Sequence, residues 1–407
     1  MTSHNMYSLS MTKNALIIGG GIAGPLTAMA LQKAGIDSVV YEAYDQGADG
    51  VGAFLTLATN GLEALRVLDL HELVAGLGMD TRSMRMTSGT GKVLAEFDNG
   101  GVTSFGMPSQ TLKRADLYRA LRDEALRRGV RIEYGKRLTA ASIERGSVRA
   151  RFTDGSTVDG DVLIGADGLR SGTRQIIDPK APQARYVGLL NTGGFARGLR
   201  LQGEPGMANF MFGRKCFFGY LIHPGGDVWW FANPGRRADP SPAELAAITQ
   251  EQWRAELMEL FKDDAGPVLQ IIEATDHILA GWSTYDFPTV PTWHNERMVI
   301  IGDAAHATSP SSGQGVSMAA EDAITLAICL RDIAEPAKAF AKYENLRRER
   351  VEKVVAWGKR NGEQKAPGPV GRVVRDLVLP VIMKQLAKGD RFRWVYEHRI
   401  DWDRKVG

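Results

Sequence analysis

The sequence predicts an α/β protein in which a Rossmann-like domain is interleaved with a second domain built on a largely antiparallel sheet, with C-terminal helices at the end. Three observations support this prediction. Residues 15–24, ALIIGGGIAG, combine a short apolar strand, a glycine turn and the start of a helical pattern. Two further short apolar strands, 162–164 and 298–301, also end in turns that contain Gly and Asp. Between them, residues 189–234 change to aromatic strands separated by glycine turns.

The length and composition limit the class of protein. A chain of 407 residues is too long for one small core, so two intermingled domains or one large α/β body are expected. The formal net charge of +3, with no basic run interleaved with aromatic residues, argues against a nucleic-acid partner. Cys216 and Cys329 are far apart in the sequence and have no C-x-x-C spacing, which indicates neither a disulfide framework nor a metal site. Both are expected to be small core residues.

The sequence shows no targeting or membrane signal. The segment before Lys13 is polar and lacks the apolar region of a signal peptide. No apolar run approaches the roughly 20 residues needed to cross a bilayer. We therefore expect a cytoplasmic enzyme, without a membrane partner, that is a monomer or a homodimer.

The first glycine turn has the spacing G-x-G-x-x-G in a strand-turn-helix context. Gly19 permits the tight turn, and Gly21 lets the backbone approach a pyrophosphate. Gly24 lets the helix pack on the strand, so that the helix start at Ala23 faces the phosphates. The motif alone serves NAD and FAD enzymes alike.

Glu42 follows the second expected strand, 38–41, near the roughly 20-residue offset at which an acidic side chain binds an adenosine ribose. A carboxylate there would repel a 2′-phosphate, so the site favours FAD or NAD over NADP. The alternative is that Glu42 merely ends a strand at the surface.

The remaining elements alternate between helices and strands. Helical patterns cover 62–70, 112–129, 243–261, 317–330 and 337–357, and extended patterns cover 84–97, 130–134, 147–152, 157–164, 189–234 and 278–282. Residues 105–110 are expected to form a loop, and 366–369 contain helix breakers. The dinucleotide-binding domain is assigned to 11–80, 111–185 and 286–335, the substrate domain to 81–110 and 186–285, and the C-terminal helical region to 336–407.

The three strand-end motifs together resemble the class A flavoprotein aromatic hydroxylases, the para-hydroxybenzoate hydroxylase-like family, over nearly the whole chain. Residues 167–174 match the family segment D-G-x-x-S-x-x-R, which is associated with FAD and the nicotinamide cofactor, so Asp167 is a cofactor-site candidate. Gly302 and Asp303 begin the segment G-D-A-A-H, and the resemblance implies that Asp303 hydrogen-bonds the FAD ribityl chain. Taken singly, each pair is also compatible with an ordinary strand-ending turn.

The loop after Asp303 is expected to contact the flavin ring. Pro310, Gly313 and Gly315 form a compact loop that leads to a helix N-terminus. Free backbone N–H groups and the positive end of the helix dipole would stabilise the negative charge of a reduced flavin. The alternative is an ordinary helix entry. His306 is interpreted as a structural residue rather than a catalytic base.

Other positions follow from the resemblance alone. Arg114, at the start of the helix 112–129, matches an arginine that reaches FAD, and Leu138 lies where a backbone contact to adenine is usual. Asn60 matches a family pattern in 57–70. One departure is Asp49-Gly50, where many relatives have a basic residue near the ribose.

The resemblance implies an FAD-dependent monooxygenase that uses NADPH or NADH, O2 and a small aromatic or other electron-rich substrate. In that family, reduced FAD reacts with O2, and a flavin C4a-hydroperoxide delivers one oxygen atom to the substrate. No Ser-His-Asp order, metal-ligand cluster or paired carboxylates stand out in the sequence, so the demanding chemistry is assigned to the cofactor.

The aromatic sheet is the expected substrate wall. By strand alternation Phe210 and Phe212 share one face, whereas Phe218, Tyr220 and Ile222 share one of their own. Tyr220 and His223 carry polar atoms that could bind a substrate, and Arg214 could hold an anion if it pointed inward. Each of these residues is also compatible with a place in the core or at the surface.

The chain resembles the shorter salicylate, urate and tetracycline hydroxylases, because it ends before the thioredoxin-like extension of many polyketide hydroxylases. Three other functions share the fold. A flavin-dependent reductase or dehydrogenase, such as the isoprenoid-reducing branch, shares the first and last motifs, but the Asp167 segment argues against it. A flavin halogenase would need the signature W-x-W-x-I-P, which Trp229-Trp230 does not provide. A flavin-binding module without activity would not need the nicotinamide-associated segment.

Overall fold

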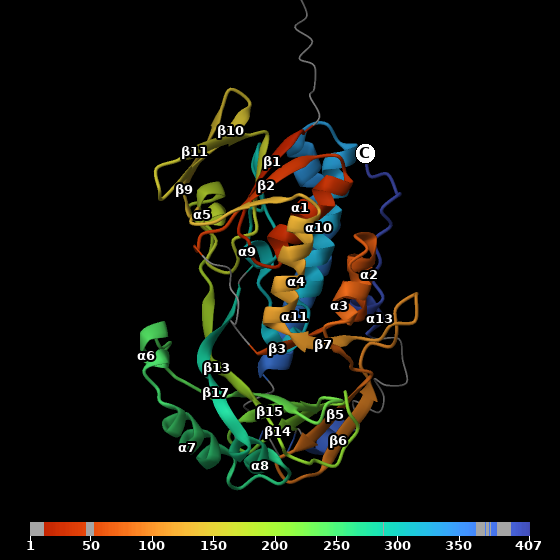
Figure 1. The fold of residues 1–407 in the computed structure, drawn as a ribbon, viewed down its shortest axis with the longest axis vertical. Helices are drawn as coiled ribbons and strands as arrows, with labels where there is room; N and C mark the ends of the chain where they lie inside the picture. Colours follow the sequence, from red (N-terminus) through yellow and green to blue (C-terminus); the bar gives the residue numbers. More distant parts are fainter. Residues whose placement is uncertain are drawn as a thin grey trace, which may run out of the picture.

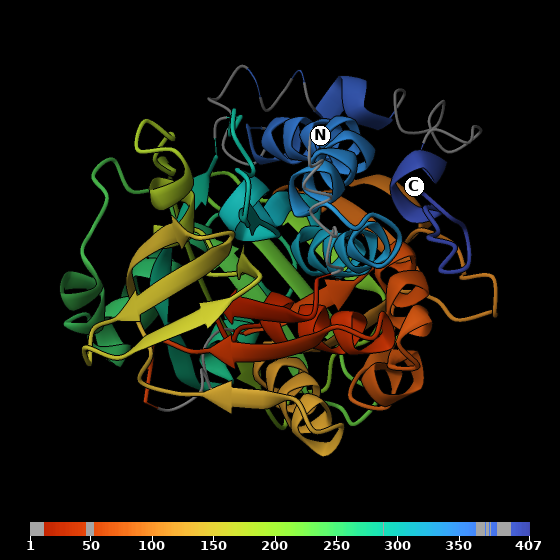
Figure 2. The same ribbon diagram turned by 90° about the horizontal axis from the view of Figure 1, so that it is seen from above.

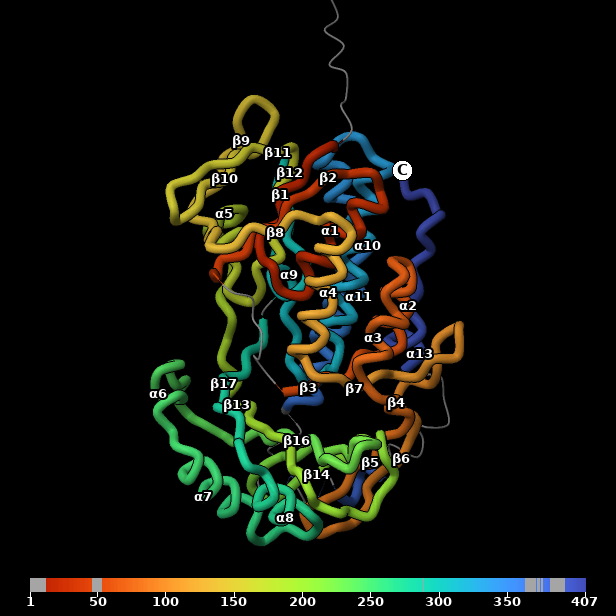
Figure 3. Tube along the Cα trace, viewed as in Figure 1, coloured from red at the N-terminus to blue at the C-terminus, as the bar shows by residue number. Residues whose placement is uncertain are grey.

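The fold has two lobes joined by two long strands, β13 (Arg185–Ala196) and β17 (Thr275–Asp286), as Figure 1 shows. The structure is a computed structural model that describes residues 12–45, 53–287, 289–363, 371, 374, 376–380 and 392–407. Asp49-Gly50 and the breaker-rich segment 366–369 lie outside the described residues. The α/β class and the interleaving of two domains are confirmed, because the chain passes repeatedly between the lobes (Figure 3).

The first lobe is built on a five-stranded parallel sheet with the order β18-β12-β1-β2-β8. Its strands are β1 (Asn14–Ile18), β2 (Asp37–Tyr41), β8 (Arg131–Glu133), β12 (Val162–Gly165) and β18 (Met298–Ile300). The central strand β1 is almost entirely buried and apolar, as expected for a parallel strand covered on both faces. Consequently the carboxyl ends of β1, β12 and β18, where the three motifs begin, lie at the same edge.

Helices cover one face of this sheet and a small sheet covers the other. Helices α1 (Ala23–Lys33) and α10 (Gly315–Asp332) pack against each other, and α4 (Arg114–Arg127) packs on α1. The opposite face carries β9 (Leu138–Glu144), β10 (Ser147–Phe152) and β11 (Thr157–Gly160), where Val148 and Phe152 cluster with Leu16 and Ile18. Figure 2 shows this yellow sheet on one side of the red strands and the blue helices on another.

The second lobe is built on a seven-stranded sheet with the order β17-β13-β16-β15-β14-β5-β6. Besides β13 and β17, its strands are β5 (Ser83–Ser88), β6 (Val93–Asp98), β14 (Ala208–Phe212), β15 (Phe217–Ile222) and β16 (Val228–Asn233). All neighbouring pairs are antiparallel except β14 with β5, which confirms the largely antiparallel sheet. One face is covered by α7 (Gln250–Phe261) and α8 (Val268–Glu273), which follow α6 (Pro242–Ala246).

The other face of this sheet points toward the first lobe. There it meets a small sheet of β3 (Phe54–Leu57), β7 (Gln110–Lys113) and β4 (Met79–Asp80). Phe54 contacts Trp229 and Phe231, with ring centroids 5.7 and 6.0 Å apart. These ring contacts join the small sheet to the aromatic face of the large sheet.

The other described helices surround the first lobe. They are α2 (Thr59–Val67), α3 (His71–Ala75), α5 (Gly172–Ile177), α9 (Asp303–His306), η1 (Pro310–Ser312), α11 (Pro336–Glu363) and α13 (Arg393–Tyr396). The C-terminal residues run along the outside of this lobe, and the Thr59 hydroxyl donates to the carbonyl oxygen of Tyr396 at 2.9 Å. Within the described parts of the chain, no helix has both the length and the apolar character to traverse a bilayer.

Candidate active site

The glycine turn has two glycines that packing requires and one that faces open space. Gly19 has φ +108°, and a Cβ there would lie 2.4 Å from the Ala166 carbonyl oxygen. A Cβ on Gly24 would lie 2.0 Å from the Gly19 carbonyl oxygen, so α1 meets β1 at a distance that only glycine permits. A Cβ on Gly21 would meet no atom within 4 Å. The turn therefore leaves an open cradle at Gly21, in front of the N-terminus of α1.

Glu42 lies directly beside this turn. Its Oε2 accepts a hydrogen bond from the Gly20 N–H at 2.6 Å, and its Oε1 accepts one from the Tyr44 N–H at 3.0 Å. The carboxylate thus stabilises the glycine turn from the end of β2. Leu138 begins β9 and packs, half-buried, against the cluster around Phe152.

The segment that begins at Asp167 holds the second strand end in place. The Asp167 carboxylate accepts hydrogen bonds from the Ser171 hydroxyl at 2.5 Å and from the Thr173 N–H and hydroxyl at 2.9 Å. Arg174 is 1% exposed and donates to the carbonyl oxygens of Leu169 at 2.9 Å and Ala304 at 2.8 Å. This segment therefore connects the turn after β12 to the turn after β18.

Asp303 provides an acceptor without a partner. Gly302 has φ +56°, and the side chain of the next residue, Asp303, is exposed. Surrounding protein atoms displace water and raise the pKa of Asp303, although His306 and Arg114 oppose this shift. Among the described residues, no group donates a hydrogen bond to its carboxylate. An exposed carboxylate ringed by protein is well placed to accept hydrogen bonds from ligand hydroxyls.

The loop from Pro310 to Gly315 provides donors. Gly313 is left-handed with φ +62°, and a Cβ on either Gly313 or Gly315 would meet no atom within 4 Å. Helix α10 begins at Gly315, and its first intrahelical bond runs from the Met318 N–H to the Gln314 carbonyl at 2.8 Å. The N–H groups before Met318 therefore have no helical acceptor and face outward at the positive end of the dipole.

These features fit FAD. The open cradle at Gly21 suits the pyrophosphate, the unpaired Asp303 carboxylate suits the ribityl hydroxyls, and the N-terminus of α10 suits the electron-rich edge of the flavin ring. Arg114, at the start of α4, lies close enough to Asp303 to lower its pKa. The residues that would hold FAD therefore come from the edge at which the three motifs meet.

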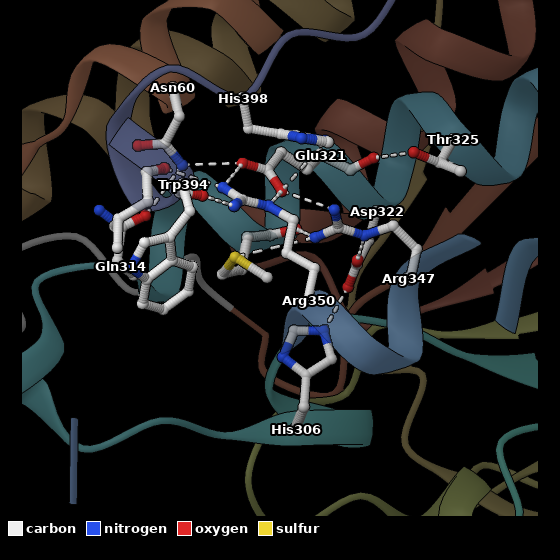
Figure 4. A network of polar contacts seen from close by, with 12 residues as sticks. Asn60, His306, Gln314, Glu321, Asp322, Thr325, Arg347, Arg350, Trp394 and His398 are labelled. Carbon is white, nitrogen blue, oxygen red and sulfur yellow. Dashed lines mark hydrogen bonds and ion pairs between the residues drawn. The ribbon is translucent and has the colours of Figure 1, made fainter. Parts of the chain in front are cut away.

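A buried network of charged residues lies beside residues 310–315, the loop that we expect to contact the flavin and call the flavin loop (Figure 4). His306 Nε2 lies 2.5 Å from Asp322 Oδ2, so the imidazole ring is part of this network. Arg347 is 1% exposed and donates to Asp322 at 2.7 Å and to Glu321 at 2.6 Å. Arg350 also donates twice to Glu321, at 2.8 Å. The sequence analysis missed these residues, because the four charges lie on two helices whose pairing only the fold reveals.

The pKa values of the two carboxylates reflect this pairing. Burial alone would raise them, but Arg347 and Arg350 hold the pKa of Glu321 at about 2. His306 and Arg347 likewise hold the pKa of Asp322 well below its usual range. Both carboxylates are therefore ionised at neutral pH.

The network reaches the loop through an amide chain and a close helix contact. The Asn60 amide donates to Gln314 Oε1 at 2.9 Å and to Glu321 Oε1 at 2.7 Å. On the other side, a Cβ on Gly358 would lie 2.8 Å from the Ser312 Cβ, so α11 packs directly on η1. Gly358, like the four charged residues, has no signal in the local sequence that points to this contact.

The face of the large sheet that points toward β3 is aromatic. Phe210 and Phe212 lie on this face with Phe217 and Phe231, which confirms that the first two share a face. A Cβ on Gly219 would lie 2.4 Å from the Phe231 ring, so this glycine makes room for the wall. His223 also belongs to this side, because its ring stacks on Trp229 at 5.1 Å.

The structure places two other candidates away from this wall. Tyr220 packs, with Phe218 and Ile222, into the cluster beneath α7 and α8, on the opposite face of the sheet. Arg214 lies in the turn after β14, where its Nε is 3.9 Å from the buried Asp264 carboxylate. Strand alternation predicted the shared faces, but only the fold shows which face is directed at the cofactor edge.

A cavity of about 340 Å³ opens between the flavin loop and the aromatic sheet. Pro310 and Ser311 line it on one side, and Asn191 and Asn233 line it on the sheet. No group of His, Cys, Asp and Glu side chains among the described residues is arranged to hold a metal ion. Cys216 and Cys329 are buried, free thiols in the two main cores, as expected.

Known proteins resemble this chain over most of its length. The family described as "FAD binding domain" matches residues 12–358. The chain is 30% identical to the FAD-dependent urate hydroxylase of Klebsiella pneumoniae over 84% of this chain and 87% of the relative. It is 32% identical to the 3-amino-4-hydroxybenzoate 2-monooxygenase PtnB3 of Streptomyces platensis over 93% and 94%, respectively.

Solved structures show the same fold. The crystal structure of Klebsiella pneumoniae HpxO with FAD and uric acid superimposes with a TM-score of 0.79 at 25% identity, over 92% of this chain and 96% of that one. A salicylate hydroxylase substrate complex superimposes with a TM-score of 0.78 at 21% identity, over 95% and 96%. The chain therefore belongs to the FAD-binding family of flavoprotein monooxygenases, as the resemblance to class A aromatic hydroxylases predicted.

Proposed function

We propose that this protein uses NADPH or NADH, O2 and bound FAD to hydroxylate a small aromatic or other electron-rich molecule. The observation that carries the proposal is the convergence of three groups at one sheet edge. These are the cradle at Gly21, the unpaired carboxylate of Asp303 and the N-terminus of α10. The loop before α10 lines a cavity at Pro310 and Ser311, and the large sheet lines the same cavity at Asn191 and Asn233.

Bound FAD would supply the redox chemistry of a monooxygenase, in which the nicotinamide provides the electrons, one atom of O2 enters the substrate and the other leaves as water. The protein's own groups provide position and electrostatics. The N–H groups at the start of α10 stabilise negative charge on the ring. Asp303 and Arg114 hold the chain between the ring and the phosphates. The rings of Phe210, Phe217 and Phe231, which are tilted against one another, exclude water and present an apolar surface to an aromatic substrate.

The relatives support the substrate class. Those named above act on urate and on 3-amino-4-hydroxybenzoate, as their names state, and both are small, flat and electron-rich. A third relative, from Stigmatella aurantiaca, is an aurachin C monooxygenase/isomerase that is 30% identical over 86% of this chain. Together they favour an aromatic or heteroaromatic substrate here.

The test uses the purified protein loaded with FAD. A panel of phenolic, indolic and purine compounds is added with NADH or NADPH, and nicotinamide oxidation, O2 consumption and product mass are measured together. We expect at least one compound to stimulate both consumption rates and to gain one oxygen atom. Stimulated nicotinamide oxidation without O2 consumption would instead identify a reductase or dehydrogenase, and O2 consumption with peroxide but no product would identify an uncoupling effector.

A further inference from the structure

The cavity beside Pro310 has a polar corner at the end of the aromatic wall. Asn233 is the last residue of β16 and pairs in register with Phe217, so the corner continues the same face of the sheet. Asn191 lies next to it on β13 and is 7% exposed. The Asn233 amide donates to Asn191 Oδ1 at 2.5 Å. A fixed pair of amides thus borders an otherwise apolar wall.

The hydrogen bond between the two amides determines which way Asn191 points. Asn233 Nδ2 also donates to the carbonyl oxygens of Leu190 and Ala232 at 3.2 Å. The Asn191 side-chain oxygen is therefore used as the acceptor, and its Nδ2 is turned away from Asn233. No described group accepts a hydrogen bond from this nitrogen. It therefore supplies a preset donor to the cavity that Asn191 lines.

The rim of the cavity is positively charged. Lys359, near the end of α11, lines the cavity and is exposed, and no carboxylate among the described residues forms an ion pair with it. Arg185 also lines the cavity and donates to Asp286 at 2.9 and 2.5 Å. Asp286 is the only carboxylate among the described lining residues, and Arg185 pairs with it. The field at the mouth therefore favours an anion.

We infer that Asn191 is a specificity-determining residue that donates a hydrogen bond to an anionic oxygen of a planar aromatic substrate, with Lys359 at the rim contributing the complementary charge. The oxygen belongs to a ring carboxylate or to an ionised ring hydroxyl. This inference rests on the proposed function, because it places the substrate in the cavity between Pro310 and the amide pair. The ring would lie beside Tyr186 and Leu189, which line this cavity, and its anionic oxygen next to Asn191.

The experiment measures binding rather than turnover. Aromatic anions are titrated into the FAD-loaded protein next to neutral counterparts of similar shape, such as 4-hydroxybenzoate with 4-hydroxybenzamide and benzoate with benzamide. The change in the visible flavin spectrum reports Kd. We expect at least one anion to bind ten times or more tightly than its neutral counterpart. Raising the pH through the hydroxyl pKa of a bound phenol distinguishes an ionised hydroxyl from a carboxylate.

Two variants of Asn191 separate binding from folding. Asn191→Asp keeps an oxygen acceptor for Asn233 but places a negative charge in the cavity, so we expect the anion to bind at least tenfold more weakly. Asn191→Leu should also weaken it tenfold, while FAD content and the melting temperature serve as folding checks. Lys359→Gln should weaken the anion several-fold, and the matched control Lys338→Gln, at an exposed lysine on the same helix, should not.

The outcomes are distinguishable. If neutral counterparts bind as tightly as the anions, if no aromatic anion binds, or if Asn191→Asp binds an anion like the wild type, the inference is overturned. The proposed function then stands as long as some compound gains an oxygen atom. If anions bind as expected but no compound is oxygenated, the proposed function fails and the binding assignment survives.

Discussion

Arg174 donates a hydrogen bond to the carbonyl oxygen of Ala304 at 2.8 Å, although the two residues are 130 positions apart in the sequence. This bond joins the helix after β12 to the turn that carries Asp303. Because Arg174 is almost fully buried and stacks over the Phe287 ring at 4.3 Å, the guanidinium fixes the position of that turn. The segment D-G-x-x-S-x-x-R thus has a structural role in this chain that is independent of any ligand contact.

Replacing Arg174 should destabilise the protein and weaken FAD binding together. Arg174→Met removes two charged hydrogen bonds to carbonyls, which we expect to cost about 2–4 kcal/mol of unfolding free energy. Asp303 should then lose its fixed position and FAD its affinity. Denaturant unfolding and an FAD titration check both effects. Arg151→Met, at an exposed strand position, is the control and should change neither. A variant with full stability and full FAD affinity would contradict this role.

The glycines of the first turn should separate folding from binding. Gly24→Ala places a Cβ 2.0 Å from a backbone oxygen, so we expect a protein that fails to fold or unfolds far more easily. Gly21→Ala meets no atom within 4 Å, so the FAD-free protein should fold with nearly unchanged stability. Its methyl group should nevertheless obstruct the pyrophosphate and weaken FAD binding at least tenfold. Circular dichroism melting and fluorescence titration with FAD provide the two readouts. Equal FAD affinity in Gly21→Ala and the wild type would refute the cradle.

Asp303 should show a trade-off between stability and binding. Its folded-state pKa is raised, so the folded protein binds this proton more tightly than the unfolded chain does. The FAD-free wild type therefore loses stability as the pH rises from the pKa that Asp303 has in the unfolded chain toward the higher pKa that it has in the folded protein. The loss persists at every higher pH. Asp303→Asn removes this penalty. We expect the FAD-free variant to melt higher than the FAD-free wild type at pH 7 but to retain less FAD on gel filtration.

Two results would count against this assignment. One is a variant that keeps stoichiometric yellow FAD, and the other is an FAD-free variant that melts lower than the wild type at pH 7. A suitable control is Asp276→Asn, because Asp276 is exposed near the start of β17, in the second lobe.

The buried network should make the protein sensitive to acid. The pKa of Glu321 is about 2 in the folded protein against an ordinary value of 4.5, so its contribution is present above about pH 4.5 and is lost as the pH falls toward 2. Arg347→Met leaves two buried carboxylates with too little compensation, which we expect to cost about 3–5 kcal/mol. Its acid-unfolding midpoint should move to a higher pH. Arg127→Met breaks an exposed ion pair with Glu124 and should cost less than about 1 kcal/mol. Equal losses in the two variants would contradict the network.

Much of the cofactor edge could be predicted from local sequence. Positions that need a positive φ or a close backbone contact are occupied by glycine, so they can be recognised in the sequence. The motifs at Gly19, Asp167 and Gly302 also each follow a buried strand. Parallel strands then bring these ends to one edge. The aromatic wall could be predicted only in part. Strand alternation grouped Phe210 with Phe212 and Tyr220 with Ile222, but it does not say which face a domain buries.

The sequence by itself determined the fold class, the glycine turn, the strand-end motifs and the loop that leads into α10, because these depend on residues that are neighbours in the chain. The tertiary structure decided the rest. The pairing of Glu321 and Asp322 with Arg347, the approach of Gly358 to the flavin loop, and the meeting of Asn191 with Asn233 join segments with no fixed spacing. Their positions depend on how two lobes pack, which no local pattern encodes.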